Sequence, residues 1–157
     1  MANKKYFFVA TLLLLTHLFA VGQKDSTSLP ILKTGWYFVA KNNTGIKMKL
    51  DKDTLSYSIN PEPILTAKNI KTLQLRKGEN GNYYLLMKFD KQGTDAWYHA
   101  TRISIGSELA FILDNNLIYT PKVNSEITGG IAILQRLIYT SKKLEGFKNI
   151  IEDEISK

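Results

Sequence analysis

The chain has 157 residues, of which 44% are hydrophobic, and a formal net charge of +7 at pH 7. This length fits one domain or two small subdomains, with enough buried surface for a core that needs no crosslinks. The sequence has no cysteine, which excludes disulfides, thiolate metal sites, a cysteine nucleophile and a lipoprotein anchor.

Residues 1–22 have the pattern of a secretory signal peptide. Lys4 and Lys5 give a positive start, residues 6–20 are mostly apolar, and Ala-Val-Gly at 20–22 is a cleavage site of small residues. The alternative is an uncleaved membrane anchor, although the apolar run is shorter than the roughly 20 residues of a spanning helix. We expect an exported protein that begins at Gln23, lacks a membrane span after cleavage, and resides in the periplasm or elsewhere outside the cytoplasm.

Cleavage would remove two of the 21 basic residues and none of the 14 acidic ones, leaving a net charge of +5. The basic residues are scattered along the chain, which is typical of an ordinary solvated surface. Weak attraction to anionic headgroups stays open, whereas nucleic acid is not an expected partner of an exported protein.

Residues 23–33 are polar and contain Pro30, so we expect a flexible leader. Residues 34–62 predict a three-stranded N-terminal β-meander, because alternating or apolar runs are separated by turn residues. Its strands are expected at 35–40, 46–50 and 55–59. Asn60-Pro61-Glu62-Pro63 is expected to close it, since proline lacks the N–H that a central strand needs.

Residues 63–157 predict a second unit that contains two helices. Asp90 is the expected N-cap of the first helix, whose apolar face would consist of Ala96, Trp97, Ala100 and Ile103. Ser141 is expected to cap the second, whose apolar face would consist of Leu144, Phe147, Ile151 and Ile155.

The expected strands of this unit cover 72–76, 83–89, 109–113, 117–120 and 131–139. The turn at 114–116, Asp-Asn-Asn, suits a tight hairpin because these residues tolerate positive φ. The predicted fold class is α+β: the N-terminal β-meander is followed by a mostly antiparallel sheet with two helices packed on one face.

The segment 109–130, LAFILDNNLIYTPKVNSEITGG, resembles the signature of the SecD/SecDF protein-export family, in the head region of its first periplasmic domain. The matching residues are Leu109, Ala110, Leu113, Asp114, Pro121, Val123, Ile127, Gly129 and Gly130. The sequence departs from the pattern at Asn115, usually glycine, and at Thr120, usually alanine. The helix that precedes the signature in the family is matched by Phe89, Gly93, Trp97 and Thr101. Arg136-Leu137 replaces a glycine-aromatic step found in the family.

No catalytic site is evident, so we do not expect an enzyme. The expected mature chain has a single histidine, His99, with no second histidine to share a metal, and no phosphate-binding loop follows Gly129-Gly130. We therefore predict neither a metal nor a cofactor. The candidate ligand-binding residues are those of the loop after the hairpin and its frame: Asp114, Pro121, Val123, Asn124, Ile127, Thr128, Gly129 and Gly130.

The resemblance implies a non-catalytic exported binding module that holds unfolded or emerging polypeptide during protein export, with translocon components as further possible partners. The family's proton-coupled transmembrane part has no counterpart in this sequence. Peptide would be held at an exposed sheet edge or at the loop 121–130 by strand addition. The alternative is a cell-envelope structural or partner-docking protein that reuses the fold with no role in export. The sequence does not specify the oligomeric state.

Overall fold

A computed structural model describes residues 30–41 and 44–157. The expected signal peptide and most of the expected leader lie outside the described residues. The strands are β1 (Gly35–Val39), β2 (Ile46–Lys49), β3 (Ser56–Thr66), β4 (Ile70–Lys77), β5 (Tyr83–Phe89), β6 (Leu109–Leu113), β7 (Asn116–Tyr119) and β8 (Ile131–Leu134). The helices are α2 (Lys91–Ile103) and α3 (Ser141–Ile155), and Ala67–Asn69 form a 3₁₀ turn. The predicted α+β class is confirmed.

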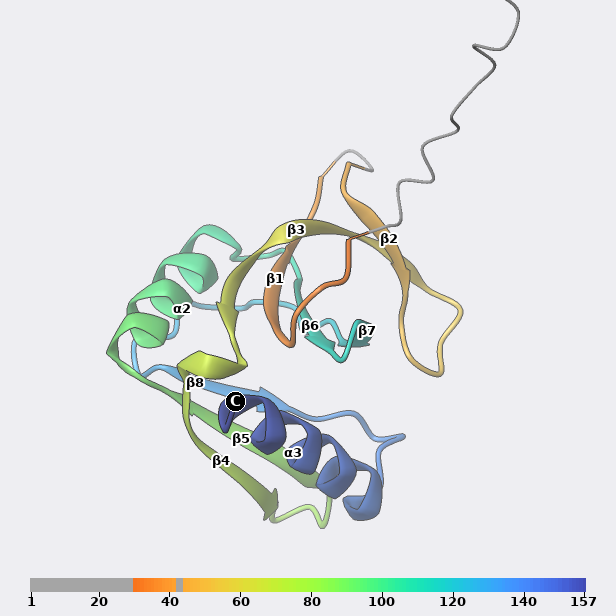
Figure 1. Ribbon diagram of the computed structural model, residues 1–157, viewed down its shortest axis with the longest axis vertical. Helices are drawn as coiled ribbons and strands as arrows, with labels where there is room; N and C mark the ends of the chain where they lie inside the picture. Colours follow the sequence, from red (N-terminus) through yellow and green to blue (C-terminus); the bar gives the residue numbers. More distant parts are fainter. Residues whose placement is uncertain (1–29, 42–43) are drawn as a thin grey trace, which may run out of the picture.

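The strands form two antiparallel sheets, one of order β2-β3-β1-β6-β7 and one of order β4-β5-β8 (Figure 1). The strand order of the first sheet differs from a meander, because β3 lies between β2 and β1. β3 is 11 residues long, so its first part pairs with β2 and its second part pairs with β1. It also runs through the expected boundary at residues 62 and 63.

Pro61 and Pro63 do not end β3, although we expected prolines to close the strand there. Both are exposed, and both lie beyond the segment that pairs with β2. The register between β1 and β3 shifts around Tyr37, which faces Pro63. Proline is tolerated at such an irregular, one-sided position because no ladder hydrogen bond requires its missing N–H.

The hairpin β6–β7 belongs to the sheet of the N-terminal strands and not to the sheet of β4 and β5. β6 is buried on both faces: Leu109, Phe111 and Leu113 contribute to one core cluster, while Ala110 and Ile112 contribute to another. This double burial explains a continuous apolar run where a half-exposed strand would alternate.

The five-stranded sheet curls so that its two edges meet. Leu50, directly after β2, forms a parallel bridge with Leu117 of β7, and the Asp51 N–H donates to the Leu117 carbonyl at 2.8 Å. The smaller core cluster lies on the concave side and includes Leu32, which is 4% exposed. The end of the expected flexible leader is therefore packed against the sheet.

The larger core cluster fills the space between the two sheets and the helices. In α2, the Asp90 side chain accepts from the Gly93 N–H at 2.7 Å, as an N-cap should. Trp97 and Ala100 are buried, but Ile103 is 72% exposed, so the apolar face of α2 is narrower than expected. The helix ends at Ile103, and its last turn extends past the core.

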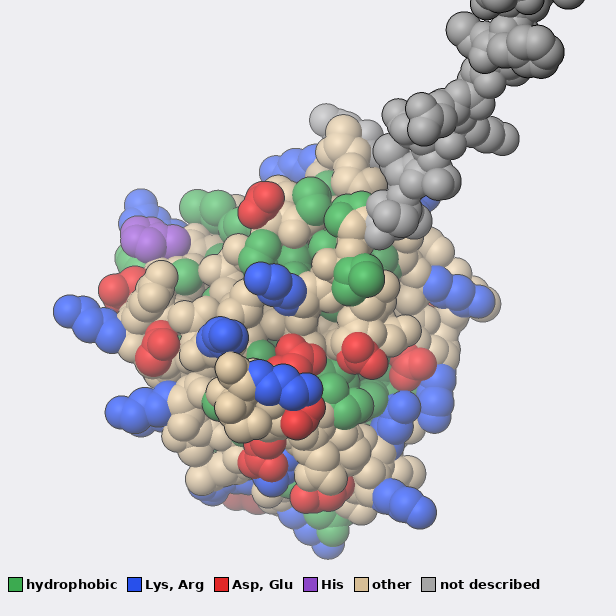
Figure 2. All heavy atoms as spheres, in the orientation of Figure 1, with side chains coloured by type: hydrophobic (Ala, Val, Ile, Leu, Met, Phe, Trp, Pro, Cys, Tyr) green, Lys and Arg blue, Asp and Glu red, His purple; other side chains and the backbone are tan. Residues whose placement is uncertain are grey.

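α3 packs on β4 and β5 and contributes Leu144, Phe147 and Ile151 to the core, as predicted, whereas Ile155, the fourth residue of the expected apolar face, is 37% exposed at the end of the helix. Its N-cap is Thr140, one residue before the expected Ser141. Figure 2 shows acidic side chains gathered across the middle of the face that α3 occupies, with basic side chains dispersed around them. Among the described residues, no helix is long and apolar enough to span a bilayer.

Candidate functional site

A cavity of about 380 Å³ lies between α2, the loop that follows β7, and β8. Its walls are Trp36 and Leu109 from the five-stranded sheet, Trp97 and Thr101 from α2, loop residues 121–125 with Ile127, and residues 131–133 of β8. Successive side chains of a strand point to opposite faces. A cavity that three successive residues of β8 line therefore includes the backbone edge of that strand.

The loop that forms one wall is fixed to the end of α2. The Thr101 hydroxyl accepts from the Ile127 N–H at 2.9 Å, and the Val123 N–H donates to the Ser107 carbonyl at 2.8 Å. The Gly106 N–H donates in turn to the Val123 carbonyl at 2.8 Å. These hydrogen bonds hold the apolar side chains of Val123 and Ile127 toward the cavity without a helix or strand in the loop.

Two tryptophans form the base of the cavity. Their ring centroids lie 4.7 Å apart, and Trp36 also packs on Phe111 at 5.1 Å. Trp97 Nε1 donates to the Ile131 carbonyl at 3.0 Å, so it fixes α2 to β8. Trp36 Nε1 is buried and has no hydrogen-bond partner in the described part of the chain. Burying an unpaired donor is costly, and a ligand acceptor could offset that cost.

β8 is an edge strand, since it pairs only with β5 in the sheet of the described residues. The Phe89 N–H donates to the Gly130 carbonyl, which marks residues 89 and 130 as a hydrogen-bonded pair. Such pairs alternate along an antiparallel ladder. Ala132 and Leu134 therefore bond to β5, whereas the N–H and C=O of Ile133 point outward from the sheet.

The structure brings four of the candidate residues together around the cavity: Pro121, Val123, Asn124 and Ile127. Thr128, Gly129 and Gly130 are not among its lining residues and connect the loop to β8. Gly130 has a φ of +61° and lies against Thr94 of α2.

Asp114 lies away from the cavity, in the turn between β6 and β7. Its φ is +46° and that of Asn115 is +57°, so both adopt the left-handed conformation that the hairpin requires. The Asp114 N–H donates to the Thr34 hydroxyl at 3.0 Å. Asp114 therefore shapes the turn, and we exclude it from the candidate site.

Sequence reasoning missed the tryptophans and residues 131–133 as parts of the site. Trp97 stood in a recognised motif, but its spacing indicated only a core position. Trp36 is 61 positions before Trp97 in the sequence, and no local sequence pattern indicates that the two rings are in contact.

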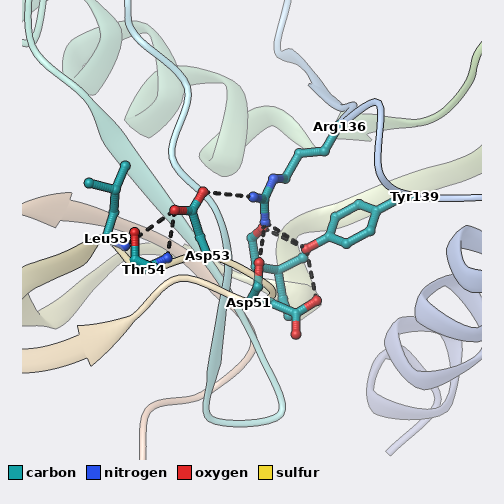
Figure 3. Close-up of polar contacts among 7 residues, drawn as sticks. Asp51, Asp53, Thr54, Leu55, Arg136 and Tyr139 are labelled. Atoms are coloured by element: carbon teal, nitrogen blue, oxygen red, sulfur yellow. Dashed lines mark hydrogen bonds and ion pairs between the residues drawn. The ribbon is translucent and has the colours of Figure 1, made fainter.

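A polar network fixes the segment that follows β8 (Figure 3). The Arg136 guanidinium donates to the Asp51 carbonyl at 2.6 Å and to the Asp53 carboxylate at 3.2 Å, both in the β2–β3 turn. It also lies 3.1 Å from the Tyr139 hydroxyl. This network joins the segment after β8 to the other sheet. It also explains why β8 ends at Leu134, although we expected the strand to continue to Tyr139.

Tyr139 completes the network. Its hydroxyl lies 2.9 Å from the Ile118 carbonyl and 3.1 Å from the Asp51 carboxylate. Burial raises the pKa of Tyr139 from its ordinary value of 10 to about 12, which places it further above neutral pH, where the protonated hydroxyl can donate. We interpret the network as structural, because Arg136 and the carboxylates of Asp51 and Asp53 all have hydrogen-bond partners within the chain.

The described residues show no constellation typical of metal binding: no three His, Cys, Asp or Glu side chains converge on one point among them. His99 is exposed on α2, with its ring 5.4 Å from that of Tyr98.

Comparison with known proteins identifies the family of this chain. Residues 43–138, more than half of the chain, match the family described as "SecDF, P1 head subdomain". The protein translocase subunit SecDF of Thermus thermophilus is 27% identical over 126 residues, which are 74% of this chain and 17% of that protein. The protein translocase subunit SecD of Leptotrichia buccalis is 31% identical over 71 residues, which are 45% of this chain and 18% of that protein.

Solved structures share the fold. A crystal structure of SecDF in a super-membrane-facing form superposes with a TM-score of 0.60 at 18% identity, covering 74% of this chain and 18% of that one. A structure of SecDF, described as a membrane component that enhances protein export, gives 0.60 at 17% identity, covering 77% of this chain and 63% of that one. The chain spans less than a fifth of the length of the curated relatives it matches. The resemblance seen in the sequence is confirmed, and the chain belongs to the SecDF P1 head subdomain family.

Proposed function

We propose that this chain is an extracytoplasmic, non-catalytic module that binds unfolded polypeptide in an extended conformation during protein export. The observation that carries the proposal is the position of an apolar cavity directly along the free backbone edge of β8. Membership of the family supports the link to export, since its relatives are named as protein translocase subunits. Translocon components are further proposed partners.

Unfolded polypeptide suits this site because it offers two things at once. Its backbone has unpaired N–H and C=O groups that can extend the sheet at Ile133, as in β-strand addition. Its apolar side chains can enter a cavity lined by tryptophan, leucine, valine and isoleucine. A folded protein offers far less of both, because most of its backbone groups pair within its own helices and sheets and most of its apolar side chains fill its core.

The proposal is tested with a fluorescently labelled protein that is kept permanently unfolded by reduction and alkylation of its cysteines. The purified chain is added in increasing amounts, and binding is followed by fluorescence anisotropy. We expect binding of the unfolded form and none of the native form. Ile127→Asp should weaken binding by about tenfold or more, because a carboxylate in the cavity would lose its hydration when the ligand enters.

Ile103→Asp is the matched control. It makes the same change at the end of α2, where the side chain is 72% exposed and does not line the cavity. It should bind like the parent protein, and thermal unfolding of both variants shows whether the fold is retained. Equal weakening by both variants, or binding that neither affects, would contradict the assigned site. If the chain does not bind unfolded protein but co-purifies with one folded partner, the structural or docking role would be favoured.

A further inference from the structure

We propose that the β8 edge selects segments in which consecutive residues are apolar, over amphipathic strands in which apolar and polar residues alternate. The inference rests on the proposed function and adds the class of segment that is bound. It follows from what an added strand would meet on each of its two faces.

The backbone determines where such a strand would lie. Ile133 presents an outward N–H and C=O, whereas the Ile131 carbonyl already accepts from Trp97 Nε1 at 3.0 Å. The hydrogen bonds of an added strand would therefore centre on Ile133. A bound residue opposite Ile133 places its side chain on the same face as Ile133, and the residues next to it point to the opposite face.

The inner face of an added strand would meet the cavity. Ala132 and Leu134, the inward residues of β8, are 3% and 0% exposed, and Val123 and Ile127 line the opposite wall. Apolar side chains are favoured here, as they would be in any binding strand with one buried face.

The outer face is unusual because the edge strand itself is apolar there, although the exposed Lys88 of β5 lies across the ladder from Ile131. Ile131 and Ile133 point away from the core and are 37% and 45% exposed. The neighbour of Ile133 across the ladder is Leu86, which is only partly buried. Edge strands of stable proteins usually carry charged residues that prevent pairing.

The outer face of the sheet becomes polar farther from the β8 edge. The outward residues of β4, on the far side of the sheet, are Thr72, Gln74 and Arg76. The exposed isoleucines thus lie where an added strand would cover them. A strand with apolar side chains on both faces would bury surface on both, whereas an alternating strand would gain on the inner face alone.

The experiment compares two peptides of about nine residues with identical composition and charged ends, titrated with the purified protein by fluorescence anisotropy. One has its apolar residues in a central run, and the other has the same residues alternating with serine. We expect the continuous run to bind about tenfold more tightly. In the double variant with Ile131→Thr and Ile133→Thr, the continuous peptide should lose most of this advantage and the alternating peptide should bind as before.

Threonine keeps the β-branch and the backbone N–H, so the variant changes the outer face and leaves the edge intact. Ile103→Thr, at an exposed site outside the cavity, should preserve the preference. Equal affinity of the parent protein for the two peptides would overturn the inference and leave the proposed function standing. Failure to bind either peptide or unfolded protein would overturn both. A preference that the double variant retains would show that the outer face does not cause it.

Discussion

Replacing Phe111 with alanine is expected to lower the free energy of unfolding by about 3 to 5 kcal/mol, the usual cost of removing a buried phenyl ring. Phe111 is 0% exposed in β6, between β1 and β7. Its ring centroid lies 5.1 Å from that of Trp36, the residue opposite it on β1. The ring therefore supports the base of the cavity, and its loss would leave a void that rigid neighbouring strands cannot fill.

Chemical denaturation of the parent protein and the variant measures this difference. Ile103→Ala is the control, because it also shortens a large apolar side chain, at a site that is 72% exposed. It should change the free energy of unfolding by about 0.5 kcal/mol or less. Similar losses in the two variants would contradict the core described for β6.

Replacing Gly130 with valine is expected to cost about 2 to 4 kcal/mol, for two reasons that add. The φ of +61° is strained for a β-branched residue. A Cβ at this position would also lie 2.1 Å from the Thr94 hydroxyl oxygen and 2.8 Å from Thr94 Cβ. The chain can enter β8 beside α2 only if residue 130 has no side chain.

Gly129→Val separates this effect from a general loss of flexibility. A Cβ at Gly129 meets nothing within 4 Å, and its φ is not in the left-handed region. This variant should unfold near the parent's denaturant midpoint. Combining Gly130→Ala with Thr94→Ala should recover part of the loss of Gly130→Ala alone, because the contacts with the Thr94 hydroxyl and methyl groups are removed while the contact with its Cβ and the strained φ remain. A Gly130 variant as stable as the Gly129 variant would refute the close contact between α2 and the start of β8.

Local chemistry accounts for the elements that the sequence predicted well. Asp114 and Asn115 adopt the positive φ that their short polar side chains tolerate, as the hairpin turn requires. Asp90 caps α2 through its carboxylate, as its place before the helix indicated. These features depend on a few consecutive residues, which a sequence displays directly.

The choice of strand partners was not predictable in the same way. The alternation of apolar and polar residues indicates that β2 and β3 are strands, and the apolar run at 35–40 indicates the same for β1. It does not indicate that β3 is long enough to pair with both β1 and β2 and to lie between them. Likewise, the run at 109–113 predicted a strand but not that it joins β1. Pairing depends on residues far apart in the chain, which a single sequence does not bring together.

The candidate site was predictable in part for the same reason. The loop at 121–130 was identified from its flanking proline and glycines, and its residues 121–125 and Ile127 line the cavity. The other walls come from β1, α2 and β8, and only the fold shows that they converge. Arg136 illustrates the same limit: it stood out as a departure from the family pattern, but its partners lie 83 and 85 positions away in the β2–β3 turn.

The most direct test of strand addition is amide hydrogen exchange at Ile133, with and without saturating unfolded polypeptide. Its N–H points away from β5, so we expect it to exchange faster than the Ala132 N–H, which bonds within the ladder. Binding of an extended segment at this edge should slow exchange at Ile133 by about tenfold or more and leave Ala132 unchanged. Saturated binding with unaltered exchange at Ile133 would contradict the account, because the bound polypeptide would then not extend the sheet.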